Sequence, residues 1–264
     1  MRIKIYFSNP DGKTYLPINT NYYLVRLIEY LTFEYRRYLN SLVSYDNRQR
    51  QFNMYTFSQL IIPERKITDY KLGILSKEFY WYIASPFYQF LGIIARELRN
   101  RKVVKIYNKW FPVTQVRFIC SPSFESSEAR FTCLSPIAVY RQDFNDRPAH
   151  SYQFNGGYIL PDQKEYLEYI EKDLLTKYRI LQGKPKKDIK MDLQFDQNYI
   201  VRRNNKITKV IALENGNSFK EYIRGVLAPL QIKAEPEILQ LIYDSGLGQL
   251  NNLGFGMLET ISQT

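Results

Sequence analysis

Residues 246–259 read Gly-Leu-Gly-Gln-Leu-Asn-Asn-Leu-Gly-Phe-Gly-Met-Leu-Glu, which sets four glycines within eleven residues. The residues before this stretch predict a short helix at 235–244, and those after it predict a strand at 255–261. A glycine-rich turn lets backbone N–H groups approach a phosphate closely, although near a chain end it is often only a tight connection. A helix precedes the glycines and no Gly-Lys-Ser/Thr follows, which excludes a dinucleotide-binding fingerprint and a mononucleotide P-loop.

This helix, loop and strand are the last elements of a pattern that occurs twice in the chain. In the first half we expect a strand at 3–7, a helix from about residue 21 with apolar positions to Leu42, a strand at 54–62, one or two strands at 70–84, a helix after Ser85-Pro86, and a strand at 113–120. In the second half we expect a strand at 129–139, a helix at 162–181, and strands at 191–195, 206–212 and about 219–230 before the final helix and strand.

Each half has the order β-α-β-β-α-β, which is that of a ferredoxin-like unit. We therefore predict an α+β fold of two tandem ferredoxin-like (RRM-like) domains. The domains span residues 1–121 and 129–264, a Ser/Pro/Glu-rich linker spans 122–128, and the glycine-rich loop spans 246–256.

Composition bounds the class of protein. The 264 residues are 45% hydrophobic and 24% charged, so the chain is neither disordered nor fibrous. No stretch approaches the ~20 apolar residues of a membrane span, and the first residues lead into no signal-peptide core. Two cysteines, Cys120 and Cys133, exclude a disulfide scaffold, and the lone His150 argues against a histidine-rich metal site. We expect a soluble, cytoplasmic protein without a metal, a cofactor or a membrane partner.

The charge balance points to a polyanionic partner. The chain carries 37 Lys and Arg against 26 Asp and Glu, for a net charge of +11, together with 23 Tyr and 16 Phe. Aromatic rings among cations suit single-stranded nucleic acid, because bases stack on rings while cations hold phosphates. The alternative is that most of these rings pack a core.

The chain resembles the CRISPR repeat-processing endoribonucleases of the repeat-associated mysterious protein (RAMP) superfamily. The resemblance begins at the Gly-x-Gly-x-x-x-x-Leu-Gly-Phe-Gly string and covers nearly the whole chain. Further matching stretches are 16–28, 52–58 (Phe-Asn-Met-Tyr-Thr-Phe-Ser), 134–139 (Leu-Ser-Pro-Ile-Ala-Val) and 169–178. The fold that the resemblance implies agrees with the two ferredoxin-like halves.

The resemblance also implies where RNA binds. In this family the glycine-rich loop and the adjacent cleft bind the repeat RNA beside the scissile phosphate, a role that falls here on Gly246, Gly248, Gly254 and Gly256, with Asn251 and Asn252 as polar neighbours. From the residues themselves, the basic run at the end of the second helix is a candidate for contacts with the RNA backbone: Arg96, Arg99, Arg101 and Lys102. The alternative is that this run only caps and solvates the helix end.

The resemblance further implies metal-independent cleavage, in which the ribose 2′-hydroxyl attacks the adjacent phosphate and leaves a cyclic phosphate and a 5′-hydroxyl. Many family members use a Tyr, a His and a Lys. Here Glu29 stands at the Tyr position with Tyr30 beside it, 43–47 contains no His, and Asn53 stands near the Lys position. The candidate replacements are Tyr30 and Tyr45 as proton carriers and Arg48 and Arg50 as stabilisers of phosphate charge.

Two functions follow. The first is an endoribonuclease that cleaves precursor CRISPR RNA within its repeats from a histidine-free site. The second is a non-cleaving relative that binds the repeat and holds or delivers CRISPR RNA to an effector complex. A third hypothesis, that the chain is a backbone subunit of an effector complex, is less well supported, because such subunits usually lack this two-domain layout. Besides repeat RNA, an effector complex and a second copy of the chain remain open as partners.

Overall fold

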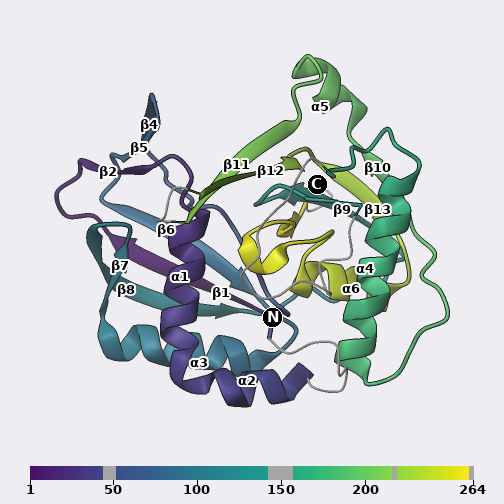
Figure 1. The fold of residues 1–264 in the computed structure, drawn as a ribbon, viewed down its shortest axis with the longest axis horizontal. Helices are drawn as coiled ribbons and strands as arrows, with labels where there is room; N and C mark the ends of the chain where they lie inside the picture. The colour runs from purple at the N-terminus through teal and green to yellow at the C-terminus, as the bar shows by residue number, and fades with distance from the viewer. Residues whose placement is uncertain (44–51, 142–156, 216–218, 262–264) are drawn as a thin grey trace.

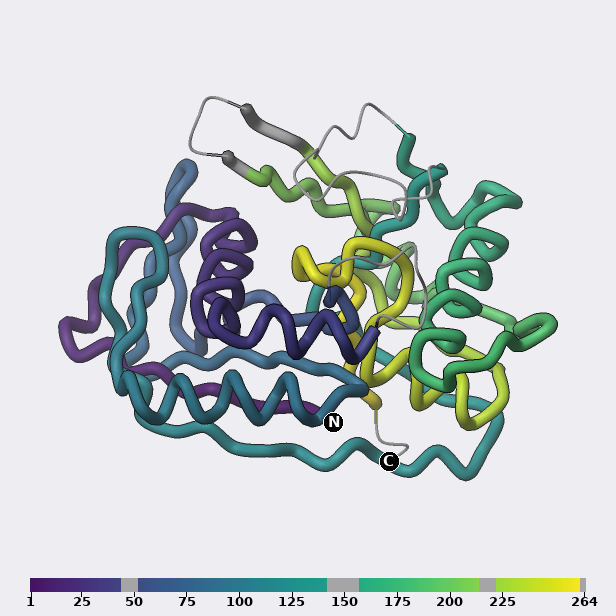
Figure 2. The backbone as a smooth tube through the Cα atoms, turned by 60° about the horizontal axis from the view of Figure 1, so that its bottom comes forward, coloured from purple at the N-terminus to yellow at the C-terminus, as the bar shows by residue number. Residues whose placement is uncertain are grey.

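A computed structural model describes residues 1–43, 52–141, 157–215 and 219–261. The chain forms two α+β halves side by side, joined by a segment that Figure 2 shows running between them. Residues 120–127 of this segment form neither helix nor strand. No helix in the described ranges is long and apolar enough to cross a membrane.

The first half is a sheet covered on one face by helices (Figure 1). Its strands lie in the order β3-β6-β1-β8-β7, and all neighbours are antiparallel. The strands are β1 (Arg2–Ser8), β3 (Thr56–Phe57), β6 (Glu78–Ala84), β7 (Val103–Ile106) and β8 (Lys109–Ile119). The helices are α1 (Asn21–Thr32), the 3₁₀ turn η1 (Phe33–Tyr35), α2 (Arg36–Val43) and α3 (Tyr88–Arg101). A small sheet lies beside them in the order β2-β5-β4: β2 (Thr14–Pro17), β4 (Arg65–Thr68) and β5 (Lys71–Ile74).

The second half repeats this plan. Its sheet has the order β10-β13-β9-β14, again antiparallel throughout. Its strands are β9 (Glu128–Cys133), β10 (Asp192–Phe195), β13 (Leu230–Lys233) and β14 (Leu258–Thr260), and its helices are α4 (Glu165–Gln182) and α6 (Pro236–Ser245). Between β10 and β13 lie the short helix α5 (Gln197–Arg202) and a hairpin of β11 (Thr208–Asn215) and β12 (Phe219–Val226). The shared strand order confirms the prediction of tandem ferredoxin-like domains.

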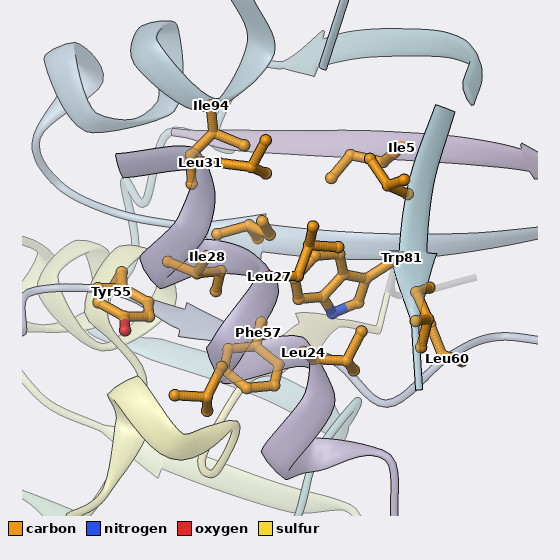
Figure 3. Close-up of a cluster of buried hydrophobic side chains, with 14 of the residues drawn as sticks. Ile5, Leu24, Leu27, Ile28, Leu31, Tyr55, Phe57, Leu60, Trp81 and Ile94 are labelled. Atoms are coloured by element: carbon orange, nitrogen blue, oxygen red, sulfur yellow. The ribbon is translucent and has the colours of Figure 1, made fainter. Parts of the chain in front are cut away.

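The core of the first half forms because α1 places an apolar stripe on the sheet. Leu24, Leu27, Ile28 and Leu31 recur at helical spacing and are buried beside Trp81 of β6. Figure 3 shows these side chains pointing toward one another. The cluster extends into the second half through Phe255 and Leu253 of the glycine-rich segment. The core of the first half therefore includes residues of the second half, while most of the second half packs around a core of its own.

Arg2 is a second link between the halves. Its guanidinium is buried, donates to the carbonyls of Tyr243 (2.9 Å) and Leu258, and pairs with Glu259 at 3.1 Å. The guanidinium carbon lies 3.4 Å from the centre of the Tyr243 ring. A buried charge with this many partners holds β1 of the first half against α6 and β14 of the second.

Several expected elements differ from the structure. The region expected as strand at 70–84 holds two strands, β5 and β6, and the strand expected at about 219–230 ends at Val226, before β13 begins at Leu230. The helix expected from residue 21 to Leu42 is interrupted at 33–35, where η1 turns the chain before α2 begins. The strand expected at 54–62 has only Thr56–Phe57 in the ladder. The strand expected at 129–139 ends at Cys133, and Ile137 and Ala138 form isolated bridges instead, because Pro136 has no N–H to continue a ladder.

Candidate functional site

Tyr30 and Arg101 meet on the exposed side of α1 and α3. The Tyr30 side chain is 58% exposed, and its phenol oxygen accepts a hydrogen bond of 2.6 Å from Nη1 of Arg101. The guanidinium carbon lies 4.4 Å from the ring centre, and Glu97 lies 3.4 Å from Nη2 of the same side chain. Sequence reasoning assigned these two residues to different roles, and the fold brings them into contact.

A shallow groove continues this face along α3. It has a volume of about 330 Å³ and is lined by Tyr35, Tyr38, Gln89, Gly92, Ile93 and Arg96. The Tyr35 phenol donates to Glu97 at 3.1 Å, and the Arg96 guanidinium carbon lies 4.9 Å from the Tyr35 ring centre. Rings and guanidinium groups held together in this way offer stacking surface and positive charge at one place.

The four basic residues expected to act together divide into two groups. Arg96 and Arg101 lie on the face described above. Arg99 turns to the sheet, where its Nη2 donates to the Val116 carbonyl at 3.3 Å. Lys102 ends α3 with a left-handed backbone (φ 60°), and its N–H donates to the Leu98 carbonyl.

Three of the four candidate catalytic residues, Tyr45, Arg48 and Arg50, lie outside the described residues, as does His150. The described residues on either side of 44–51 are tied together, because the Phe52 N–H donates to Oδ1 of Asn40 at 2.9 Å. Phe52 therefore lies against α2.

The glycine-rich loop is the most buried of the candidate segments. Lys177 of α4 donates to the carbonyls of Gly246 (3.0 Å) and Gly248 (2.9 Å) and to Oδ1 of Asn251 (2.6 Å). Its ammonium also pairs with Asp173 at 2.5 Å, where burial raises the pKa of the carboxyl while Lys177 acts in the opposite direction. The loop thus folds around a buried ammonium group.

Two side chains of the first half bind the same loop. Nδ2 of Asn21, at the start of α1, donates to the carbonyls of Leu253 (2.9 Å) and Gly254 (3.2 Å). The Thr56 hydroxyl donates to the Phe255 carbonyl at 2.8 Å. The loop therefore lies between the two domains and is held from both.

The glycines are required by this close packing. A Cβ on Gly254 would lie 2.3 Å from the Phe57 ring, and one on Gly256 would lie 2.0 Å from the Leu247 carbonyl oxygen. Several loop N–H groups already donate within the protein, among them Gly246 to Ile242 and Gly256 to Pro136. The expected contact of Gly246, Gly248, Gly254 and Gly256 with RNA stays a prediction, as does that of Asn251 and Asn252. Asn252 is half-buried, whereas the four glycines and Asn251 are buried.

Sequence reasoning missed Lys177, Asn21 and Thr56 as partners of the loop. A signal for Lys177 was available, because it follows Leu174 and precedes Tyr178 on the apolar stripe of α4. A lysine on a buried stripe needs acceptors, and the loop carbonyls supply them.

Comparisons with known proteins agree with this architecture. The model of the CRISPR-associated protein Cas6 C-terminal family matches residues 119–260. The chain belongs to the Cas6 family. It is 26% identical, over the full length of both chains, to a CRISPR-associated endoribonuclease-like protein Cas6 of Pyrococcus furiosus. It is 23% identical to CRISPR-associated endoribonuclease Cas6 1 of Methanocaldococcus jannaschii, covering 99% of this chain and 93% of the relative.

A solved structure supports the whole Cas6 fold. A RAMP protein described as binding different RNA substrates superposes with a TM-score of 0.77 and 25% identity, covering 99% of this chain and 100% of that one. The similarity spans both halves, so the Cas6 architecture extends from β1 through the glycine-rich loop.

Proposed function

We propose that this Cas6-family chain binds the repeat sequences of precursor CRISPR RNA and cleaves within the repeat by metal-independent attack of a ribose 2′-hydroxyl. The observation that supports cleavage most directly is the 2.6 Å contact between the Tyr30 phenol and the Arg101 guanidinium. A phenol can carry a proton, and an exposed guanidinium can donate to phosphate oxygens. Relatives named as CRISPR-associated endoribonucleases support RNA cleavage.

In this reaction the 2′-oxygen forms a new bond to the adjacent phosphorus while the bond from phosphorus to the 5′-oxygen breaks. The products are a cyclic phosphate and a 5′-hydroxyl. A base must take the 2′-proton, an acid must supply one to the 5′-oxygen, and cations must stabilise the extra phosphoryl charge. We assign proton transfer to Tyr30 and Tyr45, and charge stabilisation to Arg48, Arg50 and Arg101.

The rest of the α1–α3 face would bind the RNA strand that enters the site. Arg96 beside Tyr35 offers a cation and a ring along the groove. On the loop, Asn252 is the half-buried polar side chain that we assign to RNA, while the buried glycines hold the loop backbone in shape. Arg99 and Lys102 would add long-range attraction for the phosphates.

A second function is supported by the sequence. The chain has one histidine, His150, and none at 43–47, where many family members place the catalytic one. Losing acid–base assistance typically costs about 10²–10⁴-fold in rate. A chain of this kind could bind the repeat without cleaving it and hold or deliver CRISPR RNA to an effector complex.

One experiment separates these functions. Purified protein in excess is incubated in EDTA with end-labelled repeat RNA and with a copy that carries a 2′-deoxy ribose at the cleavage position. Cleavage of the all-ribose RNA alone supports the proposed reaction. Tight binding of both RNAs with no cleavage over many hours would contradict the nuclease function and support the repeat-binding function. Cleavage that needs added Mg²⁺ would contradict the metal-independent mechanism.

A further inference from the structure

The strand β7 forms an open edge of the first sheet. It is the last strand in the order β3-β6-β1-β8-β7 and lies at the end of the sheet away from the second half (Figure 1). The opposite edge strand, β3, lies against the glycine-rich loop, because the Thr56 hydroxyl donates to the Phe255 carbonyl. No described strand pairs with the outer side of β7. An edge left open in this way can pair with a strand of another chain.

Two residues of β7 direct their backbone hydrogen-bonding groups away from the sheet. The Val113 N–H donates to the Lys102 carbonyl at 2.7 Å, and bonded and non-bonded pairs alternate along an antiparallel ladder. Val103 and Lys105 occupy the non-bonded positions, so the N–H and C=O groups of both residues face the open edge. The register agrees, since Val103 lies opposite Pro112, which has no N–H to donate to β7.

The hairpin of β7 and β8 is held in place from inside. Val104 and Ile106 are buried in the core of the first half, where β7 packs against α1. Tyr107 follows the strand with a left-handed backbone (φ 58°), and its ring centre lies 5.0 Å from that of Tyr23 on α1. An edge that is already fixed loses little conformational entropy when a partner binds.

Apolar side chains flank the open edge. Trp110 is 66% exposed and Val103 is 40% exposed. Lys105 pairs with Trp110, and its ammonium lies 5.7 Å from the centre of the indole ring. The three side chains share one face, because Val103 and Lys105 are two positions apart on a strand. Tryptophan is enriched among the residues that contribute most to protein–protein binding. An exposed tryptophan beside an open strand edge therefore favours a protein partner.

The charge of the hairpin indicates which partner fits. Lys102, Lys105 and Lys109 are exposed, and within the described ranges none of their ammonium groups pairs with a carboxylate. Lysines on an edge hinder pairing with a second copy of the chain, because like charges would face one another. They attract an acidic strand instead.

The backbone favours a polypeptide over RNA. A base could stack on Trp110, but the carbonyl oxygens at the edge repel phosphates, and Val103 offers neither a donor nor a ring. A polypeptide strand, in contrast, presents N–H and C=O groups in the alternation that an open edge can bond.

We propose that the outer edge of β7 is a docking site for an extended, acidic segment of a partner protein, which adds to the first sheet as a further strand. The segment bonds to the backbone of Val103 and Lys105, its carboxylates face Lys105 and Lys109, and one of its apolar side chains covers Trp110. Main-chain hydrogen bonds give such a complex affinity, and alternate side chains give it specificity. The proposal does not depend on RNA cleavage, because β7 carries none of the residues to which we assign proton transfer or charge stabilisation.

The first test measures peptide affinity by fluorescence anisotropy. The probe is a labelled ten-residue peptide of alternating Glu and Val, and its counterpart has Lys in place of Glu. We expect the wild type to bind the acidic peptide and not the basic one. Lys105→Glu/Lys109→Glu and Trp110→Ala should each bind it at least about tenfold more weakly. Lys187→Glu/Lys190→Glu changes the net charge equally at exposed lysines of the second half and should bind as the wild type does.

The second test needs no substitution. Amide hydrogen exchange of the wild type is followed residue by residue by NMR, with and without the acidic peptide. Exchange should slow at Val103 and Lys105, whose N–H groups face the open edge, and should change little at Val104, which is already bonded to β8. This readout distinguishes strand addition from a loose electrostatic contact.

Four results would overturn the proposal while leaving the proposed function intact. The first is no binding of the acidic peptide at about 1 mM, and the second is binding without added protection at Val103 and Lys105. The third is unchanged peptide affinity of folded Lys105→Glu/Lys109→Glu. The fourth is a different occupant: repeat RNA that protects the same two amides would assign the edge to RNA, and a wild-type dimer that Trp110→Ala dissociates in sedimentation velocity would assign it to a second copy.

Discussion

The Lys177 ammonium lies 2.6 Å from Oδ1 of Asn251, and this contact sits at the centre of the glycine-rich loop. Nδ2 of the same asparagine donates to the Phe255 carbonyl at 3.0 Å. The Asn251 side chain thus connects α4 to the part of the loop that leads into β14. The loop therefore depends on a charged side chain that lies about 70 residues earlier in the chain.

Replacing Lys177 by Met should lower the free energy of unfolding by about 3–5 kcal/mol, because it leaves Asp173 and three oxygen acceptors buried without their partner. Urea denaturation measures the change. Lys164→Met, an exposed site just before the same helix, is the control and should change stability by no more than about 0.5 kcal/mol. The double variant Asp173→Leu/Lys177→Met should recover part of the loss. A Lys177→Met protein as stable as the wild type would show that the ammonium does not hold the loop.

Replacing Gly254 by Ala should destabilise the fold by about 2 kcal/mol or more, because its φ of +83° and the Phe57 ring at 2.3 Å leave no room for a Cβ. Thermal unfolding without RNA is the measurement. Gly92→Ala is the matched control, since Gly92 is helical and a Cβ there would meet nothing within 4 Å. That change should leave the melting temperature the same or raise it. Full stability of Gly254→Ala combined with lost RNA affinity would instead favour a direct RNA role for this glycine.

Removing the Tyr30 hydroxyl with Tyr30→Phe should reduce the single-turnover cleavage rate about 100-fold or more while preserving the ring. We expect this loss because Tyr30 lies on the α1–α3 face and is a residue to which we assign proton transfer. Tyr70→Phe, made on an exposed tyrosine away from that face, should cleave at the wild-type rate. Equal rates for wild type and Tyr30→Phe would remove Tyr30 from the mechanism.

Replacing Arg101 by Gln should weaken binding of repeat RNA at low salt and reduce the slope of log affinity against log salt concentration by about 1. Each phosphate contact made by a cation releases counterions, so the slope reports contacts directly. Lys190→Gln, an exposed lysine before β10, is the control for a change in net charge alone. A slope that is the same in all three proteins would mean that Arg101 touches no phosphate.

Stability at alkaline pH should depend on Cys133. Its Sγ lies 3.1 Å from the Ala228 carbonyl, and burial raises the pKa of the thiol to about 12. An unfolded thiol ionises near pH 8.5, so the stabilising contribution is complete below that pH and is lost as pH rises toward the folded value. The unfolding free energy of the wild type, relative to Cys133→Ala, should fall by up to about 1.4 kcal/mol per pH unit above about pH 9. Parallel pH profiles for the two proteins would contradict a buried thiol.

Much of the fold could be read from periodic apolar residues. Leu24, Leu27 and Leu31 predicted α1, and alternation at 3–7 predicted β1, because in both elements one face is buried and the other is open. The strands β2, β4 and β7 were not predicted, and β5 lies within the strand region expected at 70–84. The unpredicted strands have only four residues each, which is too short for a periodic pattern to stand out in the sequence, and they form because the chain brings their partners together.

The site was harder to predict for a physical reason. Glycines that cradle a phosphate and glycines that pack against a ring look alike in sequence, and only the position of Phe57 distinguishes them at Gly254. The pairing of Tyr30 with Arg101 joins residues 71 positions apart, which no local pattern reveals. Arg99 shows the converse: although it is exposed like the rest of the basic run, its guanidinium donates to the Val116 carbonyl of β8 and is not on the face with Arg96 and Arg101.

The hydrogen bond from Thr56 to Phe255 spans 199 residues of chain. During synthesis on the ribosome, Asn21, Thr56 and Phe57 emerge long before the loop that satisfies them. Until then the nascent first domain has two side-chain donors that face water instead of the loop carbonyls, and part of its core is uncovered. The first domain cannot close fully until residue 256 has been synthesised, and a nascent chain that stops before residue 246 would leave its surface open to chaperones and proteases.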